Sequence, residues 1–133
     1  MVEPYVYFNG NALAAIEFYE KVFKSTDKKI MQYKDAPANP EFPVSEEMKE
    51  RVLHSEMTIE GTKFHFSDSS YPIVIGNNIS FSIIYDTADE VEEKFNSLKE
   101  GGEVLMALAP QFFSPMYGWV TDKFGNGWQI ICR

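Results

Sequence analysis

The sequence predicts an α+β fold in which one order of elements, strand-helix-strand-strand-strand, occurs twice. Two segments with the periodicity of an amphipathic helix each follow a strand-like segment, and each precedes further strand-like segments that form a hairpin pattern. The two copies keep the same separation from strand end to helix, from Phe8 to Phe18 and from Tyr85 to Phe95. With 133 residues, the whole chain, 1–133, has the length of a single domain.

The first module, about residues 1–70, begins with the strand-like "VEPYVYF" and the turn-forming "NGN". A helix is predicted in "ALAAIEFYEKVF", for which Asn11 is a suitable N-cap residue. Its apolar positions recur at steps of three and four residues, at Ala12, Ile16, Tyr19 and Phe23. "KKIMQY" is a second candidate strand.

A proline-rich stretch, "DAPANPEFPVSEEMKER", adds length to the first module only. Its prolines exclude a central strand, so the stretch predicts a long loop with one helical turn after Ser45. The following "HSEMTIEGTKFHFSD" predicts a hairpin that turns at Glu60 and Gly61. We interpret Asp68 as a turn residue rather than a general acid.

The second module, about residues 77–133, repeats this order with "ISFSIIY" as a strand and "TADEVEEKFNSLKEGG" as a helix. Thr87 and Glu90 form a capping box at the start of that helix, and the glycine pair ends it. "EVLMALA" predicts another strand, and "YGWVTDKFGNGWQIIC" predicts another hairpin. In its turn, we expect Asp122 to cap backbone amides and Gly125 to supply a positive φ.

Charge and composition exclude several functional classes. The chain has 20 acidic residues against 12 basic ones, a formal net charge of −8, and no basic stripe. We therefore expect neither nucleic acid nor a membrane as a partner. No signal-peptide pattern or bilayer-length apolar run is present, and Cys132 is the only cysteine. We expect a packed thiol in a cytoplasmic protein.

An amide stands in the last strand-like run, where Gln129 lies between Trp128 and Ile130. If the run is a half-buried strand, alternation places Trp128 and Ile130 on one face and Gln129 on the other. A side-chain amide there needs a hydrogen-bonding partner or a ligand. Gln129 is therefore a candidate for the lining of a pocket.

The order of elements resembles that of the vicinal oxygen chelate superfamily, which has the glyoxalase and bleomycin-resistance fold. It is most similar to the PhnB-like branch in "PYVYFNGNALAAIEFYEKVF", "HSEMTIEGTKFHFSDS", "FSIIYDTADEVEEKFNSLKEGGEVLMAL" and "YGWVTDKFGNGWQI", which cover most of the chain. The resemblance implies that the two βαβββ modules form a curled mixed sheet around a cavity. It also implies a homodimer, to which we expect "ALAPQFFSPMYG" to contribute.

In metal-dependent members of the superfamily, one residue on the first strand and one on the last strand of each module bind a divalent ion. Carried over, these positions fall on Ser80 and Gln129 in the second module and on His65 in the first. The first-strand position of the first module stays open among Glu3, Pro4 and Tyr5, and alternation favours Glu3 or Tyr5. Serine and glutamine are weak metal ligands, so we expect no cofactor, with a weakly bound divalent metal as the alternative.

Other side chains share the predicted cavity face. Ser82, Tyr7 and Ser67 each follow a carried-over or candidate position by two residues, as a strand lining a pocket requires. Phe112 and Phe113 are expected to cover or line the cavity mouth. We interpret His54 and Glu56 as exposed or structural, because the resemblance gives them no ligand position.

We expect a binding protein for an unidentified small molecule, with no established reaction. The alternative is a divalent-metal-dependent isomerase, dioxygenase or transferase of the superfamily. A third hypothesis is a structural or partner-binding domain. The branch is also associated with demethylubiquinone methyltransferase-like activity, but no glycine-rich loop joins a strand to a helix to hold S-adenosylmethionine. No nucleophile-base pair or phosphate-binding loop is evident either.

Overall fold

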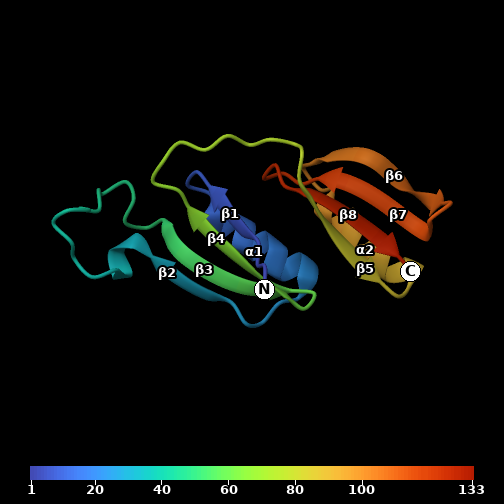
Figure 1. Ribbon diagram of the computed structural model, residues 1–133, viewed down its shortest axis with the longest axis horizontal. Coiled ribbons are helices and arrows are strands. Elements are labelled where there is room, and N and C mark those ends of the chain that lie inside the picture. Colours follow the sequence, from blue (N-terminus) through green and yellow to red (C-terminus); the bar gives the residue numbers. More distant parts are fainter. The chain divides into compact units, whose positions relative to one another are not determined.

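The computed structural model describes residues 1–133 and divides the chain into two units, Met1–Val74 and Ile75–Arg133. Each unit holds one α-helix and one four-stranded sheet (Figure 1). The elements of the first unit are β1 (Tyr5–Phe8), α1 (Ala12–Phe23), β2 (Lys29–Gln32), the 3-10 helix η1 (Tyr33–Asp35), β3 (Val52–Ile59) and β4 (Thr62–Asp68). Those of the second are β5 (Ser80–Tyr85), α2 (Ala88–Leu98), β6 (Glu103–Gln111), β7 (Ser114–Thr121) and β8 (Gly127–Cys132).

The two sheets have the same topology. Their strand orders are β1-β4-β3-β2 and β5-β8-β7-β6. In each sheet the first strand pairs with the last in parallel, and the other pairings are antiparallel. The predicted α+β fold of two βαβββ modules is confirmed, with the strands hydrogen-bonded in two sheets of four.

Helix α1 covers the predicted residues because its apolar stripe has helical spacing. The predicted positions are all buried: Ala12, Ile16, Tyr19 and Phe23. Tyr19 stacks on Phe66 of β4 with ring centroids 5.5 Å apart, and Phe8 of β1 lies 5.9 Å from the same ring. The helix therefore buries its stripe against an aromatic face of the first sheet.

The start of α1 is capped from another strand. Asn11 occupies the N-cap position, but its side chain makes no capping hydrogen bond, so the expected role of this side chain is wrong. Instead, Oδ1 of the buried Asp68, at the end of β4, accepts from the N–H groups of Gly10 at 2.7 Å and Ala12 at 3.1 Å. Its Oδ2 accepts from Val52 N–H at 3.0 Å. One carboxylate thus ties β4 to the starts of α1 and β3.

Helix α2 begins at the predicted N-cap residue Thr87, and the predicted pair of Thr87 and Glu90 is joined by two hydrogen bonds, one from the backbone N–H of Glu90 and one to its side chain. The Thr87 hydroxyl oxygen accepts from Glu90 N–H at 3.2 Å, and the hydroxyl donates to the Glu90 carboxylate at 2.9 Å. Val91, Phe95 and Leu98 form its buried side. The helix ends before the glycine pair, as expected.

Two hairpins turn where predicted. Between β3 and β4, Glu60 and Gly61 have φ angles of 47° and 88°, which suit a two-residue turn of type I′. Between β7 and β8, Asp122 Oδ1 accepts from the N–H groups of Phe124 at 2.8 Å and Asn126 at 3.1 Å. Both turns therefore depend on local residues, which is why the sequence reveals them.

Three strand limits differ from the predictions. The first strand begins at Tyr5, after Pro4, rather than at Val2. β6 runs on to Gln111 and β7 begins at Ser114, so Phe112 and Phe113 form a tight hairpin turn instead of lying in a longer loop. β6 is an edge strand with shifted register, and such strands tolerate the proline that this segment contains.

The proline-rich stretch is a loop, as predicted. It begins at Asp35, the last residue of η1, and contains neither strand nor α-helix before β3. Its one helical turn starts at Ser45, whose carbonyl oxygen accepts from Lys49 N–H at 3.1 Å.

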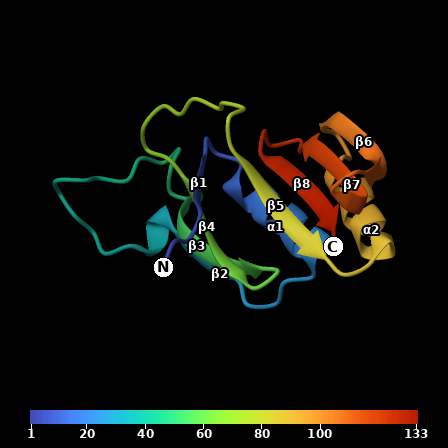
Figure 2. The ribbon, with the colours of Figure 1, turned by 45° about the vertical axis from the view of Figure 1, so that its right-hand side comes forward.

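Alternation gives each sheet one face toward its helix and one face away from it, here called the open face (Figure 2). In β8, Trp128, Ile130 and Cys132 are buried on the helix side, and Gln129 alternates with them. The expected packing of the Cys132 thiol is confirmed. The open faces therefore carry the side chains of most functional interest.

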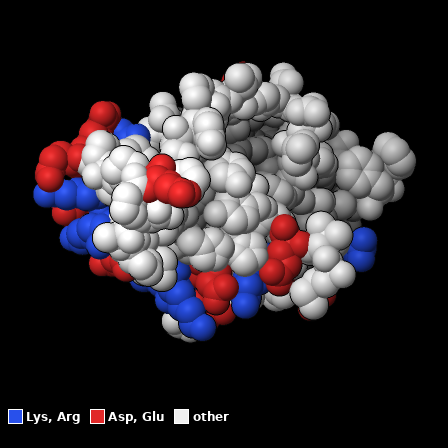
Figure 3. Space-filling model, turned by 60° about the vertical axis from the view of Figure 1, so that its left-hand side comes forward, with Lys and Arg blue, Asp and Glu red and all other residues white.

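The helices and the charged surface add two observations. No helix combines the length and apolarity needed to cross a membrane. On the face of the molecule in Figure 3, Lys and Arg side chains lie beside Asp and Glu side chains and form no continuous basic track.

Candidate functional site

The residues predicted to bind a ligand lie on both open faces and on one hairpin turn. In the first unit they are Glu3, just before β1, Tyr5 on β1 and His65 on β4. In the second unit they are Ser80 and Ser82 on β5, Gln129 on β8, and Phe112 and Phe113 between β6 and β7. Side-chain contacts link several of them within each unit.

In the second unit, Gln129 is held between a tyrosine and a serine. The Tyr117 hydroxyl donates to Gln129 Oε1 at 2.5 Å, and Gln129 Nε2 donates to Ser80 Oγ at 2.8 Å. The strand order β5-β8-β7 places the amide between its two partners. We call Ser80, Gln129 and Tyr117 the Gln129 network. The amide in the last strand thus has partners on both neighbouring strands.

The direction of these hydrogen bonds leaves two donor groups of the Gln129 network unused. Burial raises the pKa of Tyr117, so its hydroxyl stays protonated and donates at neutral pH. This fixes the oxygen of the Gln129 amide toward Tyr117 and its nitrogen toward Ser80. Ser80 accepts through its oxygen and keeps its own proton, and Gln129 keeps a second N–H. The network can therefore donate to an incoming oxygen atom.

Two aromatic side chains, Trp119 and Phe113, lie next to members of the Gln129 network. Trp119 lies opposite Gln129 in the register of β7 and β8. Phe113 packs edge-on against Tyr117 with centroids 5.0 Å apart and is 49% exposed, whereas Phe112 is fully exposed. Ser82 is exposed on the same open face, beside Gln129 in the parallel pairing of β5 and β8. Tyr117 and Trp119 were not predicted from the sequence as site residues, although alternation from Gln129 across the hairpin indicates both.

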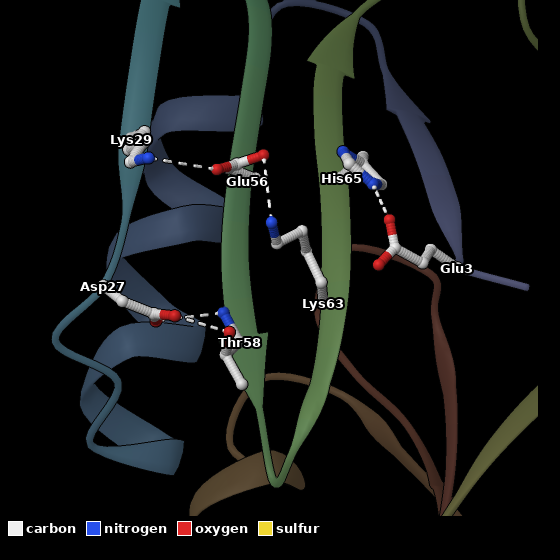
Figure 4. Close-up of polar contacts among 7 residues, drawn as sticks. All are labelled: Glu3, Asp27, Lys29, Glu56, Thr58, Lys63 and His65. Atoms are coloured by element: carbon white, nitrogen blue, oxygen red, sulfur yellow. Dashed lines mark hydrogen bonds and ion pairs between the residues drawn. The ribbon is translucent and has the colours of Figure 1, made fainter. Parts of the chain in front are cut away.

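In the first unit, His65 contacts Glu3 and Tyr5, the two residues that alternation favours for the first-strand position. Its imidazole ring stacks on Tyr5 with centroids 5.6 Å apart and an interplanar angle of 13°. Its Nε2 lies 2.9 Å from Glu3 Oε1 (Figure 4). Tyr5 also stands beside Tyr7, with centroids 4.8 Å apart.

Two further side chains lie next to His65. Glu56 is its direct partner across β3 and β4, and the rings of His54 and His65 stack with centroids 5.2 Å apart. The Glu56 carboxylate lies 3.6 Å from Lys29 Nζ and 3.7 Å from Lys63 Nζ (Figure 4). His54 and Glu56, interpreted from the sequence as exposed or structural, thus belong to the surroundings of a candidate site residue.

The metal set implied by the resemblance fits this chain poorly. Ser80 and Gln129 offer a neutral hydroxyl and a neutral amide, which are weak ligands for a divalent ion. The amide oxygen of Gln129, through which it would bind an ion, already accepts a hydrogen bond from the Tyr117 hydroxyl. We therefore derive no chemistry through an ion at these two positions.

Solved structures share the fold along the whole chain. PA1353 from Pseudomonas aeruginosa matches with a TM-score of 0.88 and 29% identity, over 100% of this chain and 97% of that one. The PhnB protein from Bacillus cereus matches with a TM-score of 0.77 and 25% identity, over 99% and 98%. Fosfomycin resistance protein FosX from Mesorhizobium loti shares the fold alone, with a TM-score of 0.65 and 7% identity, over 100% and 90%.

A curated relative points in the same direction. Protein YjdN of Escherichia coli K12 is 27% identical over an alignment 142 positions long, which covers 97% of this chain and 92% of that protein. The paired modules and these matches define a PhnB-like protein of the vicinal oxygen chelate superfamily, as the sequence motifs indicated. Residues 1–131 match the family described as 3-demethylubiquinone-9 3-methyltransferase, and the chain belongs to that family.

Proposed function

We propose that the protein binds a small, neutral, planar carbonyl compound on the open face of its second sheet. The Gln129 network is the observation that carries this proposal. Its unused donors, the Ser80 O–H and the second N–H of Gln129, suit one carbonyl oxygen. The neighbouring Trp119 suits a flat apolar group next to that oxygen.

Charge supports a neutral ligand. The network consists of a hydroxyl, an amide and a phenol whose raised pKa keeps it uncharged. The chain as a whole has a formal net charge of −8, which disfavours anions. A neutral carbonyl compound therefore matches both the local donors and the overall field.

Binding of this ligand is proposed to need no metal. The weak metal-binding strength of Ser80 and Gln129 supports this, as does the hydrogen bond that the Gln129 amide oxygen already accepts from Tyr117. Methyl transfer, which the family description names, is not part of the proposal. The turns that enter α1 and α2, at Asn9 to Asn11 and at Asp86 to Thr87, are too poor in glycine to cradle a nucleotide-like cofactor.

The proposal includes a cytoplasmic homodimer. Exposed apolar side chains on the edge strand β6 and its turn support self-association, because such a surface is rarely left uncovered. They are Val104, Leu105, Met106, Phe112 and Phe113. The buried, unpaired cysteine agrees with a reducing compartment.

A fragment screen tests the ligand class. Single-ring aromatic amides, esters and ketones would be screened by ligand-observed NMR, and hits would be titrated calorimetrically with EDTA present. We expect Gln129→Leu to weaken the hits at least about 10-fold, the loss of roughly one hydrogen bond. The matched control is Gln32→Leu, which removes an amide from the edge strand of the first sheet. Equal affinities for wild type and Gln129→Leu would contradict the proposal.

A further inference from the structure

We propose that the open face of the first sheet carries a binding site for a divalent transition-metal ion, formed by His54, Glu56 and His65. One ligand atom from each of the three side chains can be chosen so that all lie within 4.8 Å of one another. Two imidazoles and a carboxylate are the donors that zinc and its neighbours in the periodic table prefer. We call these three residues the His-Glu cluster.

The first supporting observation is an unpartnered nitrogen on His65. Glu3 Oε1 lies 2.9 Å from Nε2 and, as a carboxylate oxygen, accepts a hydrogen bond from Nε2–H, so the other nitrogen of the neutral ring, Nδ1, keeps a lone pair. That Nδ1 atom is buried and has no hydrogen-bond partner. A metal-bound histidine usually donates its second N–H to a carboxylate in this manner. The lone pair of Nδ1 is therefore oriented and available for an ion.

Two further hydrogen bonds fix which ring nitrogen of His54 carries the proton. The Tyr5 hydroxyl donates to Ser67 Oγ at 3.3 Å, so its oxygen accepts from His54 Nδ1–H, also at 3.3 Å. With its proton on Nδ1, His54 keeps the lone pair on Nε2. Each histidine of the His-Glu cluster thus has one nitrogen held by the protein and one nitrogen free to bind a metal.

Glu56 supplies the negative charge of the His-Glu cluster. Its partners are Lys29 and Lys63, at 3.6 Å and 3.7 Å, which is longer than a charge-assisted hydrogen bond (Figure 4). The side chains of Lys29 and Lys63 are 81% and 43% exposed, so both ammonium groups can move into water when an ion arrives. Such exposed pairs contribute little free energy, and an ion with two imidazole ligands outcompetes them.

To bind a metal ion, the three ligand atoms of the His-Glu cluster must move closer together. In a tetrahedral zinc site, ligand atoms lie about 3.4 Å apart, given metal-ligand distances of about 2.0–2.2 Å. One ligand atom of each side chain already lies within 4.8 Å of the other two, and rotation of the side chains on the β3 and β4 backbones would have to shorten these separations. Three protein ligands leave a fourth position for water or another small ligand.

This His-Glu cluster differs from the metal set carried over from the superfamily. Only His65 belongs to both, and all three ligands come from one hairpin of the first unit. The proposal does not rest on ligand binding at the Gln129 network, because the two groups of residues share no member. Gln129→Leu should accordingly leave metal affinity unchanged, while it weakens the carbonyl ligand.

Calorimetric titration with zinc chloride tests the His-Glu cluster. The protein of residues 1–133 would be stripped with EDTA, dialysed and checked for native circular dichroism. We expect one zinc ion per chain, with affinity lowered at least about 100-fold in His54→Ala and in His65→Ala, since each loses a direct ligand. Glu56→Gln should weaken binding too. The matched control, Glu92→Gln, removes one acidic charge from α2 and should bind zinc as wild type does.

Positioning by Glu3 provides a second readout. Glu3→Ala should weaken zinc binding about 10-fold, whereas Glu3→Gln, whose amide oxygen can still accept from His65 Nε2–H, should largely restore it. Cobalt(II) should give the intense visible absorption of a tetrahedral site in wild type and lose it in His54→Ala. Absence of stoichiometric zinc binding, or zinc affinity that is equal in wild type, His54→Ala and His65→Ala, would overturn the proposal.

Discussion

Replacing Gln129 with leucine should destabilise the second unit. The change removes the acceptor of the Tyr117 hydroxyl and the donor to Ser80. Tyr117 is only 5% exposed, so its hydroxyl is left without a partner, at a cost of about 1–3 kcal/mol. Ser80 is half-buried and can turn to water, which limits its share to about 0.5–1 kcal/mol. The free energy of unfolding should therefore fall by about 1.5–4 kcal/mol, the sum of the two contributions.

A double-mutant cycle isolates the interaction between the two residues. Tyr117→Phe alone leaves a half-buried amide oxygen that water can reach, and should cost about 1 kcal/mol. Once Phe replaces Tyr117, Gln129→Leu no longer orphans a buried hydroxyl. The double variant should then be destabilised by less than the sum of the single variants, with a coupling of about 1–2 kcal/mol.

Urea unfolding followed by tryptophan fluorescence is the appropriate assay. Both tryptophans, Trp119 and Trp128, lie in the second unit, so the signal reports that unit. Additive effects of the two single changes, or a cost below about 0.5 kcal/mol for Gln129→Leu, would refute the hydrogen-bond chain.

Three other predictions concern stability and assembly. Asp68→Ala removes the acceptor of three backbone N–H groups and should lower the free energy of unfolding by at least about 3 kcal/mol. Urea unfolding followed by circular dichroism measures this change, and the control Ser70→Ala, at an exposed position, should cost less than about 0.5 kcal/mol. The hydrogen bond from the Thr58 hydroxyl is the main cause that lowers the pKa of Asp27 to about 2. The ionised Asp27 carboxylate therefore stabilises the folded protein fully above the ordinary pKa of 3.8, and this stabilisation is lost as the pH falls toward 2. The stability advantage of wild type over Asp27→Asn should shrink over that range, and a constant difference would count against the assignment. Phe112→Asp should shift a wild-type dimer to monomer in sedimentation, and a monomeric wild type at micromolar concentration would refute the dimer.

Most of the fold could be predicted from local sequence patterns. The apolar spacing from Ala12 to Phe23 and the Glu60-Gly61 turn depend on neighbouring residues, and both predictions are confirmed. The capping of α1 by Asp68 depends on a residue more than fifty positions from Ala12, which no local pattern reveals. The extent of β6 was missed because proline signals a loop, although an edge strand with shifted register accommodates it.

The candidate sites were only partly visible in the sequence. Gln129 was predicted as a pocket residue because it is an amide among apolar residues. Its partner Tyr117 was not predicted, because the family resemblance gives a ligand position to Gln129 and none to Tyr117. His54 and Glu56 were set aside for the same reason. Counting back from the Glu60-Gly61 turn pairs Glu56 with His65, so strand register alone would have brought the cluster together. The hydrogen bonds that orient both histidines required coordinates.

The location of a bound fragment tests the proposed function most directly. Protein labelled with nitrogen-15 would be titrated with a hit from the aromatic carbonyl screen, in EDTA, and the side-chain N–H signals would be followed. The proposal predicts the largest shifts at the Gln129 amide and the Trp119 indole, with the Gln32 amide unmoved. Saturable binding that shifts signals elsewhere and leaves Gln129 and Trp119 unchanged would contradict it.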